Sequence, residues 1–178
     1  GKFASDANYA AKALSEALFN RAYSLYIMST MYGEIFVPQG YTEELPSNYN
    51  YARESVPNIY RMLITDLRYA YDHLPDVNEQ NLTTDFGRAT KGAAAHFLAK
   101  LYLQRAQGAK YGSSEYGVKA DGHVDTNNQK SYLGMLYKGE GAADLDSCIY
   151  YTSKVIDHGY YDLEPDFGKL FNHPLGDY

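Results

Sequence analysis

The chain has 178 residues, enough for one domain with a hydrophobic core. It is mildly acidic, with 22 Asp and Glu against 16 Lys and Arg, and its sequence contains no basic stripe, which argues against a nucleic-acid binder. No apolar run approaches the length of a membrane span, and no basic-then-apolar signal segment opens the chain.

The first half of the sequence predicts two helices. The first spans Ser5–Tyr32, with the serine as N-cap and Gly33 as a left-handed stop. The second starts after Ser55, tolerates Pro57 in its first turn and ends at Pro75. The inward face of the first helix should consist of Ala11, Leu14, Leu18, Ala22, Leu25, Ser29 and Tyr32. The corresponding residues of the second are Tyr60, Leu63, Leu67, Ala70 and Leu74.

Two further helices are predicted in the second half. The third is capped by Thr90 and stopped by Gly108. The fourth covers residues 144–158, with Gly159 as its stop, and a short turn is expected at Pro165–Phe171. The third helix should bury Ala94, Phe97, Leu98, Leu101, Tyr102 and Arg105. The fourth should bury Leu145, Cys148, Thr152, Val155 and Ile156.

The two helix pairs resemble each other in sequence. Tyr26 aligns with Tyr102 in the first members, and Leu63-Ile64 aligns with Cys148-Ile149 in the second members. Tetratricopeptide positions in the third helix are occupied by Ala95, Leu98, Ala99 and Tyr102. Since no alternating strand pattern occurs, we predict an all-α domain over residues 1–178, built from tetratricopeptide-like stacked helix pairs with two long surface loops.

The long connection between the first two helices, residues 34–54, is the candidate ligand-binding segment. It combines aromatic and polar side chains, and sugar rings bind through aromatic faces and fixed hydrogen-bonding groups. The candidate residues are Tyr41, Asn48, Tyr49, Tyr51 and Arg53. The alternative is that these tyrosines fold back onto the helices and only pin the loop. The second long connection, residues 109–142, is expected to run over the protein surface.

The sequence offers little catalytic or metal chemistry. It contains no nucleophile elbow, zinc-protease motif, phosphate loop or plausible Cys nucleophile, so we expect neither an enzyme nor a cofactor. Asp121–Asn127 lacks the glycine and the closing glutamate of a calcium loop and reads as a solvated turn, so no metal site is expected. Arg88 and Lys91 are expected to serve the scaffold, by pairing with Asp66 or Asp85.

Four blocks, in order, resemble the SusD/RagB family of outer-membrane lipoproteins. Glu16–Tyr26 is similar to its E-A-x-F-x-R-A-x-x-Y segment, and Ile59–Pro75 to Y-x-x-I-x-x-D-L-x-x-A-x-x-x-L-P. Gly87–Ala94 is similar to G-R-x-T-K-x-A-A, and Tyr150–Phe171 to the closing V-I-x-x-G-x-Y-x-L…L-F. Each block alone is weak, but together they are specific.

The resemblance implies a protein of the cell surface that captures oligosaccharides or other nutrients. It also implies delivery to a SusC-like TonB-dependent transporter, with these helices mainly as scaffold. Family members are far longer, so a lipidated N-terminus and a large C-terminal portion are expected outside these residues, and the lipid would be the link to the membrane. A different interpretation is a tetratricopeptide-type module that binds a protein or peptide in a groove.

Overall fold

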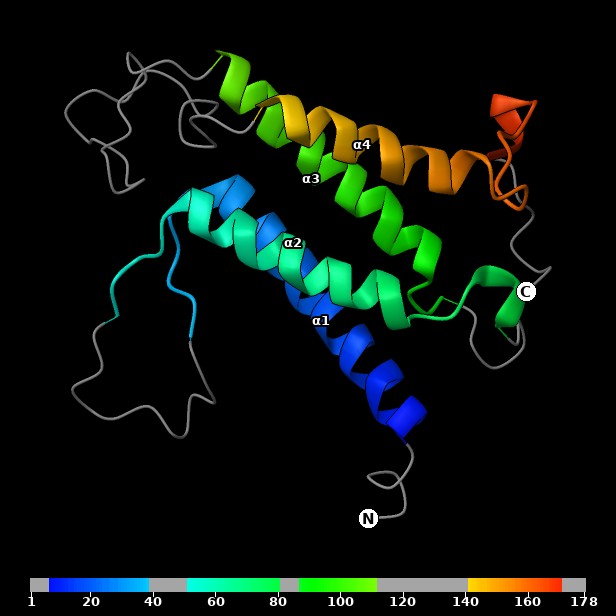
Figure 1. The fold of residues 1–178 in the computed structure, drawn as a ribbon, viewed down its shortest axis with the longest axis horizontal. Coiled ribbons are helices and arrows are strands. Elements are labelled where there is room, and N and C mark those ends of the chain that lie inside the picture. The colour runs from blue at the N-terminus through cyan, green and yellow to red at the C-terminus, as the bar shows by residue number, and fades with distance from the viewer. Residues whose placement is uncertain (1–6, 39–50, 81–86, 112–140, 171–178) are drawn as a thin grey trace.

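A computed structural model describes residues 7–38, 51–80, 87–111 and 141–170 of the protein. The described residues form four α-helices and two 3₁₀ turns, and apart from one isolated bridge they contain no β-structure (Figure 1). The prediction of an all-α fold is therefore confirmed. The helices are α1 (Ala7–Tyr32), α2 (Val56–His73), α3 (Lys91–Tyr111) and α4 (Gly141–Ile156), and the turns are Val77–Glu79 and Phe167–Leu170.

Local sequence signals account for several of the helix ends. Gly33 follows α1 with a φ of 73° and donates its backbone N–H to the carbonyl oxygen of Ser29 at 2.9 Å. Thr90 caps α3, because its Oγ1 accepts a hydrogen bond from the N–H of Ala93 at 3.1 Å. The expectation that Gly108 stops α3 is wrong, because the helix continues for three residues beyond it.

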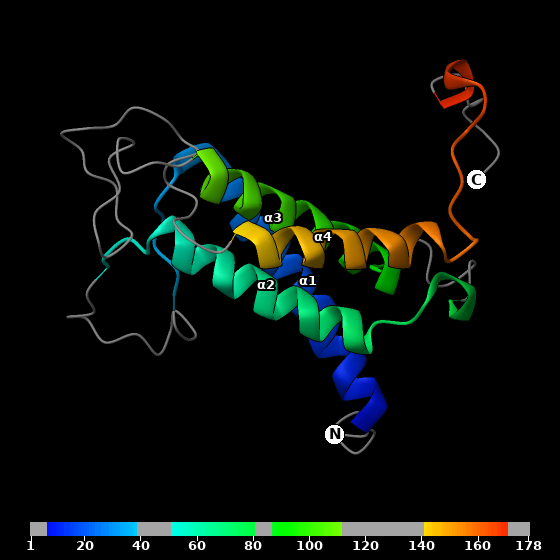
Figure 2. The same ribbon diagram turned by 45° about the horizontal axis from the view of Figure 1, so that its top comes forward.

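The helices run antiparallel to their neighbours in sequence and pack as a chain of contacts. The most extensive contacts join α1 to α2, α2 to α3 and α3 to α4, and side chains of α3 also reach α1 (Figures 1 and 2). This places α2 and α3 in the middle of the described helices, while α1 and α4 each have a free outer side. The Phe167–Leu170 turn projects beyond the end of α4, away from the helical body in both views.

The largest hydrophobic cluster draws side chains from all four helices. α2 contributes four fully buried ones, Ile59, Tyr60, Leu63 and Leu67. Phe97 of α3 meets three α1 rings edge-on, with centroid distances of 6.2 Å to Phe19, 6.2 Å to Tyr23 and 5.2 Å to Tyr26. Many of the tyrosines are thus structural.

Each helix pair is tied by one Arg–carboxylate pair. Arg21 of α1 donates through Nε and Nη2 to the two oxygens of Asp66 in α2, at 2.7 and 2.6 Å. Arg105 of α3 donates to Asp144 of α4 in the same two-pronged way, at 2.9 and 2.6 Å. The hydrogen bonds to Asp66 raise the pKa of Arg21. These pairs fix the rotation of each helix against its partner.

Arg88 and Lys91 contact the helices, although not through the partners expected. Arg88 donates its Nε to the Oε1 of Glu16 in α1 at 2.8 Å, and Asp66 is engaged by Arg21 instead. The ammonium group of Lys91 lies over the ring of Tyr71, 5.0 Å from its centroid. Asp85, the other expected partner, lies outside the described residues.

Two of the predicted inward faces are partly wrong. In α1, Leu14 and Tyr32 are 48% and 69% exposed, and in α4, Leu145 and Ile156 are 46% and 67% exposed. Thr152 of α4 is exposed as well. The inward faces predicted for α2 and α3 are buried as expected. Among the described helices, none combines the length and apolarity needed to cross a membrane.

Candidate functional site

The ends of the first long connection are held together at its base. Ile35 and Glu54 form an isolated antiparallel bridge, in which the N–H of Glu54 donates to the carbonyl oxygen of Ile35 at 2.8 Å. Ile35 and Val37 are 7% and 6% exposed and enter the core. Because side chains alternate in an extended segment, Phe36 is directed away from the core that receives its two neighbours.

A surface hollow of about 600 Å³ lies at this base, which we call the loop-base hollow. It is lined by Met28, Tyr32, Glu34, Ile35, Phe36 and Arg53. At its edge the rings of Phe36 and Tyr51 meet, with centroids 5.1 Å apart and planes inclined by 56°. The hollow thus offers aromatic surface beside a carboxylate and a guanidinium group.

The structure brings two of the predicted ligand-binding residues to this hollow. Arg53 lines it, and Tyr51, which is 62% exposed, contacts the lining residue Phe36. Tyr51 therefore packs on Phe36 of the same connection and still presents ring surface to solvent. The other three candidates, Tyr41, Asn48 and Tyr49, lie outside the described residues.

Sequence reasoning missed the part of the hollow that comes from α1 and the residues after it. Tyr32 was assigned to the core, yet it is 69% exposed and lines the hollow. Phe36 belongs to the apolar run Ile35-Phe36-Val37, in which no polar residue marks the outward position. The available signal was Gly33. Because it ends α1, it places Tyr32 in the last turn of the helix, beside the start of the connection.

Glu54 connects the loop base to the start of α2. Its Oε1 accepts hydrogen bonds from the backbone N–H of Ser55 at 3.2 Å and from the Nδ2 of Asn58 at 2.6 Å, and Arg61 in turn donates to Asn58. The carboxylate lies at the helix N-terminus, where negative charge is favourable. The Ser55 Oγ makes no capping bond, and Glu54 satisfies the backbone N–H of this N-cap residue instead of one inside the helix.

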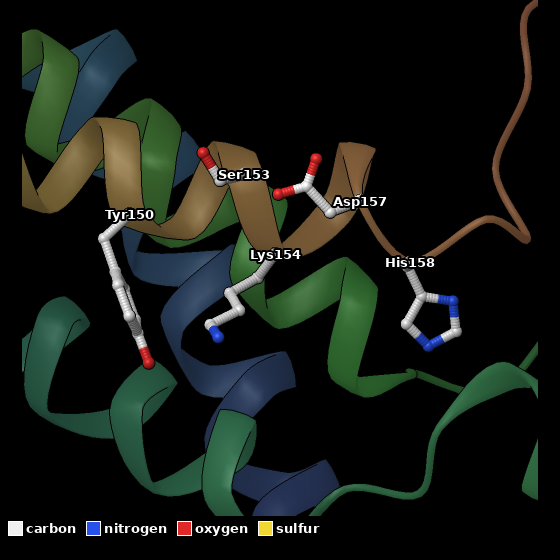
Figure 3. Close-up of a pocket in the computed structure, with 5 residues that line it drawn as sticks. All are labelled: Tyr150, Ser153, Lys154, Asp157 and His158. Carbon is white, nitrogen blue, oxygen red and sulfur yellow. The ribbon is translucent and has the colours of Figure 1, made fainter.

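A second hollow, of about 420 Å³, lies along the C-terminal half of α4 (Figure 3). It is lined by Tyr150, Ser153, Lys154, Asp157 and His158. Tyr150 and Lys154 both extend toward α2 in Figure 3, and the ammonium group lies 5.0 Å from the ring centroid. The Nε2 of His158 lies 2.7 Å from an oxygen of Asp76. The ammonium group of Lys154 and the Nε2 of His158 are thus engaged within the protein, while the buried Nδ1 of His158 has no hydrogen-bond partner.

Tyrosines close to this second hollow join α2, α3 and α4. Tyr151 meets Tyr71 edge-on at 5.3 Å and stacks with Tyr102 at 5.9 Å. Burial raises the pKa of Tyr102 and of Tyr71, because the apolar surroundings disfavour a phenolate. A hydrogen bond with Tyr151 raises the pKa of Arg68. This cluster therefore holds the three helices together. Within the described ranges no three His, Cys, Asp or Glu residues gather as metal ligands.

Comparison with known proteins identifies similar chains. A model of the SusD-like family described as starch-binding, associating with the outer membrane, matches residues 4–103. A SusD-like protein from Bacteroides ovatus is 27% identical over 162 residues, covering 91% of this chain and 24% of the relative.

Two solved structures share the fold at identities too low to show more. A SusD homologue from Bacteroides thetaiotaomicron is 18% identical with a TM-score of 0.66, covering 93% of this chain and 26% of its own. A crystal structure with xylogluco-oligosaccharide is 24% identical with a TM-score of 0.63, covering 94% and 27%. The chain thus spans about a quarter of the length of the relatives it matches.

Proposed function

Because this chain belongs to the SusD-like family, whose model matches more than half of it, we propose that it is the helical part of a glycan-capturing protein of the outer membrane. The whole protein captures oligosaccharides at the cell surface and delivers them to a SusC-like TonB-dependent transporter. The helices act mainly as scaffold. The family match is the observation that carries this proposal, and the loop-base hollow is the part of the described surface that fits a sugar best.

The chemistry of the loop-base hollow suits a carbohydrate. Sugar rings present C–H faces that pack on aromatic surface, and here the Phe36 and Tyr51 rings lie side by side at the edge of the hollow. Arg53 and Glu34 line the same hollow and can bind hydroxyl groups as donor and acceptor. The second hollow is less suitable, because Lys154 covers a face of the Tyr150 ring.

We also infer that the protein binds its ligand without chemical turnover. No catalytic motif occurs in the sequence, and the family model describes binding. Incubation of the native-length protein with plant, host and microbial oligosaccharides, followed by chromatography, should return each oligosaccharide intact. Release of shorter sugars above a no-protein control would show that it is a glycosidase.

The peptide-module alternative has less support from the surfaces of α1 and α3. Peptide clamps of the tetratricopeptide type need Asn, Lys and Arg side chains available in the groove. Here Lys100 lies over the ring of Tyr26, and the exposed positions nearby include Tyr23, Ile27 and Leu103. These surfaces therefore favour glycan capture over a peptide clamp.

Calorimetric titration of the native-length protein with the same oligosaccharide panel tests the site. For an oligosaccharide that binds, Tyr51→Ala should lower the affinity about tenfold, the equivalent of losing one aromatic contact. The matched control is Tyr160→Ala, which removes a similarly exposed tyrosine at the far end of the described helices. Equal affinities for wild type and Tyr51→Ala would exclude a role for the loop-base hollow.

Surface location and transporter binding need their own test. Intact cells that express the protein should lose it on treatment with external protease, and a tagged protein should co-purify with a TonB-dependent transporter from detergent extracts. Protection from the protease would place the protein elsewhere. Recovery of the protein alone would contradict the proposed partner while leaving ligand capture testable.

A further inference from the structure

Arg53 differs from the other five arginines of the chain. Each of those five forms a hydrogen bond through its guanidinium group with a side chain elsewhere in the protein. They are Arg21, Arg61, Arg68, Arg88 and Arg105. Arg53 is exposed and lines the loop-base hollow, and it has no hydrogen-bond or ion-pair partner among the described residues. Its guanidinium group therefore keeps all its donors available at the surface where we place the ligand.

The bridge at the loop base places Arg53 beside the aromatic rings. Ile35 and Glu54 are paired in antiparallel register, so the next pair in this register is Phe36 with Arg53. Residues opposite each other in an antiparallel pair lie on the same face. Tyr51 is two residues from Arg53 and shares that face, in agreement with the contact between the Tyr51 and Phe36 rings. The guanidinium group and the two rings thus lie on one side of the loop base.

A guanidinium group beside aromatic rings matches a sugar that carries a carboxylate. Arginine can donate two parallel hydrogen bonds to the two oxygens of a carboxylate, and such charge-assisted bonds are about twice as strong as neutral ones. Two arginines of this chain already bind carboxylates in this way, in the Arg21–Asp66 and Arg105–Asp144 pairs. A sugar hydroxyl has one oxygen and no charge, so it uses only part of what the guanidinium group offers.

We propose that the loop-base hollow selects acidic oligosaccharides, with Arg53 binding the carboxylate of a uronic acid whose ring packs on Phe36 and Tyr51. This inference rests on the proposed function, and it adds the class of glycan and the residue that selects it. The chain has a formal net charge of −6, so its overall field does not attract an acidic glycan. Selection for acidic sugars therefore depends on the local contact with Arg53.

Two carboxylates lie near Arg53, and they differ in their effect on an acidic ligand. Glu54 is turned toward the start of α2, where its Oε1 accepts hydrogen bonds from Ser55 and Asn58. Glu34 lines the hollow itself, so its charge repels a ligand carboxylate and leaves a neutral sugar unaffected. The two charges of the hollow should therefore act in opposite directions. Loss of the Arg53 charge should weaken binding of an acidic sugar, and loss of the Glu34 charge should strengthen it.

The test compares ligands that differ only in charge. Trigalacturonate and a xylotriose substituted with glucuronic acid are each titrated beside their methyl esters, which keep the rings and the hydroxyl groups. In calorimetry of the native-length protein, one of these acids should bind at least about tenfold more tightly than its ester.

Variants of the same protein assign this preference to Arg53. Arg53→Gln should lower the affinity for the acid to that for the ester, and Glu34→Gln should raise it about two- to threefold. The matched control is Arg88→Gln, which removes the same charge from an arginine that pairs with Glu16 in the first half of α1. It should leave both affinities unchanged. Because Arg53 has no partner among the described residues, its replacement should not unfold the protein.

The other outcomes overturn the inference in distinguishable ways. Equal affinities for acid and ester, or binding of neutral oligosaccharides without binding of either acid, would exclude selection for acidic sugars and leave glycan capture intact. A preference for the acid that persists in Arg53→Gln would assign the carboxylate to another residue. Equally tight binding of a sulfated galactotriose would show that any anion is accepted. If no oligosaccharide binds, acidic or neutral, the proposed function fails and this inference fails with it.

Discussion

Arg105 and Asp144 join α3 and α4 through two hydrogen bonds, with side chains only 10% and 3% exposed. The corresponding pair of the first helix hairpin, Arg21 and Asp66, leaves the arginine 52% exposed. An ion pair that is shielded from water depends on both partners being present, since a single buried charge is costly. The second hairpin is therefore the more sensitive of the two to loss of its pair.

Replacing Asp144 should show this sensitivity. Asp144→Asn leaves the Arg105 guanidinium buried without its carboxylate, so the free energy of unfolding should fall by about 3 kcal/mol. Urea denaturation followed by circular dichroism measures the change. Asp146→Asn, on an exposed position of the same helix, should change it by less than about 0.5 kcal/mol. Similar losses for the two variants would contradict the structural role of the pair.

The glycine that ends α1 should matter for both stability and ligand binding. Gly33→Ala forces a side chain into a φ of 73°, which costs about 1 kcal/mol and disturbs the chain that carries Phe36. Gly159→Ala imposes the same strain at a φ of 79°, far from the loop-base hollow. The midpoint temperature of thermal unfolding should fall in both variants. Calorimetry should show lower oligosaccharide affinity only for Gly33→Ala. Equal affinities in the two variants would mean that the backbone conformation at Gly33 does not affect ligand binding at the loop-base hollow.

Alkaline pH should destabilise the protein through Tyr102. Burial raises its pKa above the value of about 10 that tyrosine has in an unfolded chain. Above pH 10 the unfolded chain loses this proton while the folded protein retains it, so the stabilisation present below pH 10 is lost as the pH rises through the folded pKa.

Tyr102→Phe removes the ionisable group. Its urea midpoint should fall less steeply than that of the wild type as the pH rises above about 10. At pH 7 the phenol is neutral in both states, so the difference between the two proteins at pH 7 is the reference. Parallel decline of the two midpoints would mean that Tyr102 does not contribute to alkaline unfolding.

Gly92 provides space for Tyr161. A Cβ atom at position 92 would lie 2.1 Å from the Tyr161 hydroxyl, so Gly92→Ala should displace that ring while improving the helix propensity of α3. Hydrogen exchange should show faster exchange at residues 157–163 with little change in global stability. Tyr161→Ala should have the same effect, and the double variant should add nothing further. Additive effects would indicate that the two residues act separately.

The helical fold was predictable because its strongest signals are local. The face of α2 could be identified since Tyr60, Leu63, Leu67 and Ala70 repeat at helical spacing, and all four are buried. The face of α4 could not, because Leu145 and Ile156 recur at helical spacing with the half-buried Cys148 and Val155 although both are exposed, and the buried Asp144 and Tyr151 were not predicted. Periodicity identifies an apolar face, but it does not show whether the partner for that face is present.

The candidate site was predictable only in outline. A long loop rich in tyrosine directed attention to Tyr51 and Arg53, and both lie at the loop base. Tyr32 was missed, because its helical spacing with Leu25 and Ser29 indicated core. The reason is geometric: the last turn of α1 extends to where the loop begins, so its apolar residues line a hollow.

The bridge between Ile35 and Glu54 closes the first long connection at its base, whatever the length of the segment between them. Its backbone hydrogen bond and the anchoring of Glu54 at α2 do not depend on how many residues lie between them. Doubling the length of a flexible loop costs only about 0.6 kcal/mol in closure entropy. The length of the segment between these two residues can therefore change without any change in the helices beneath it.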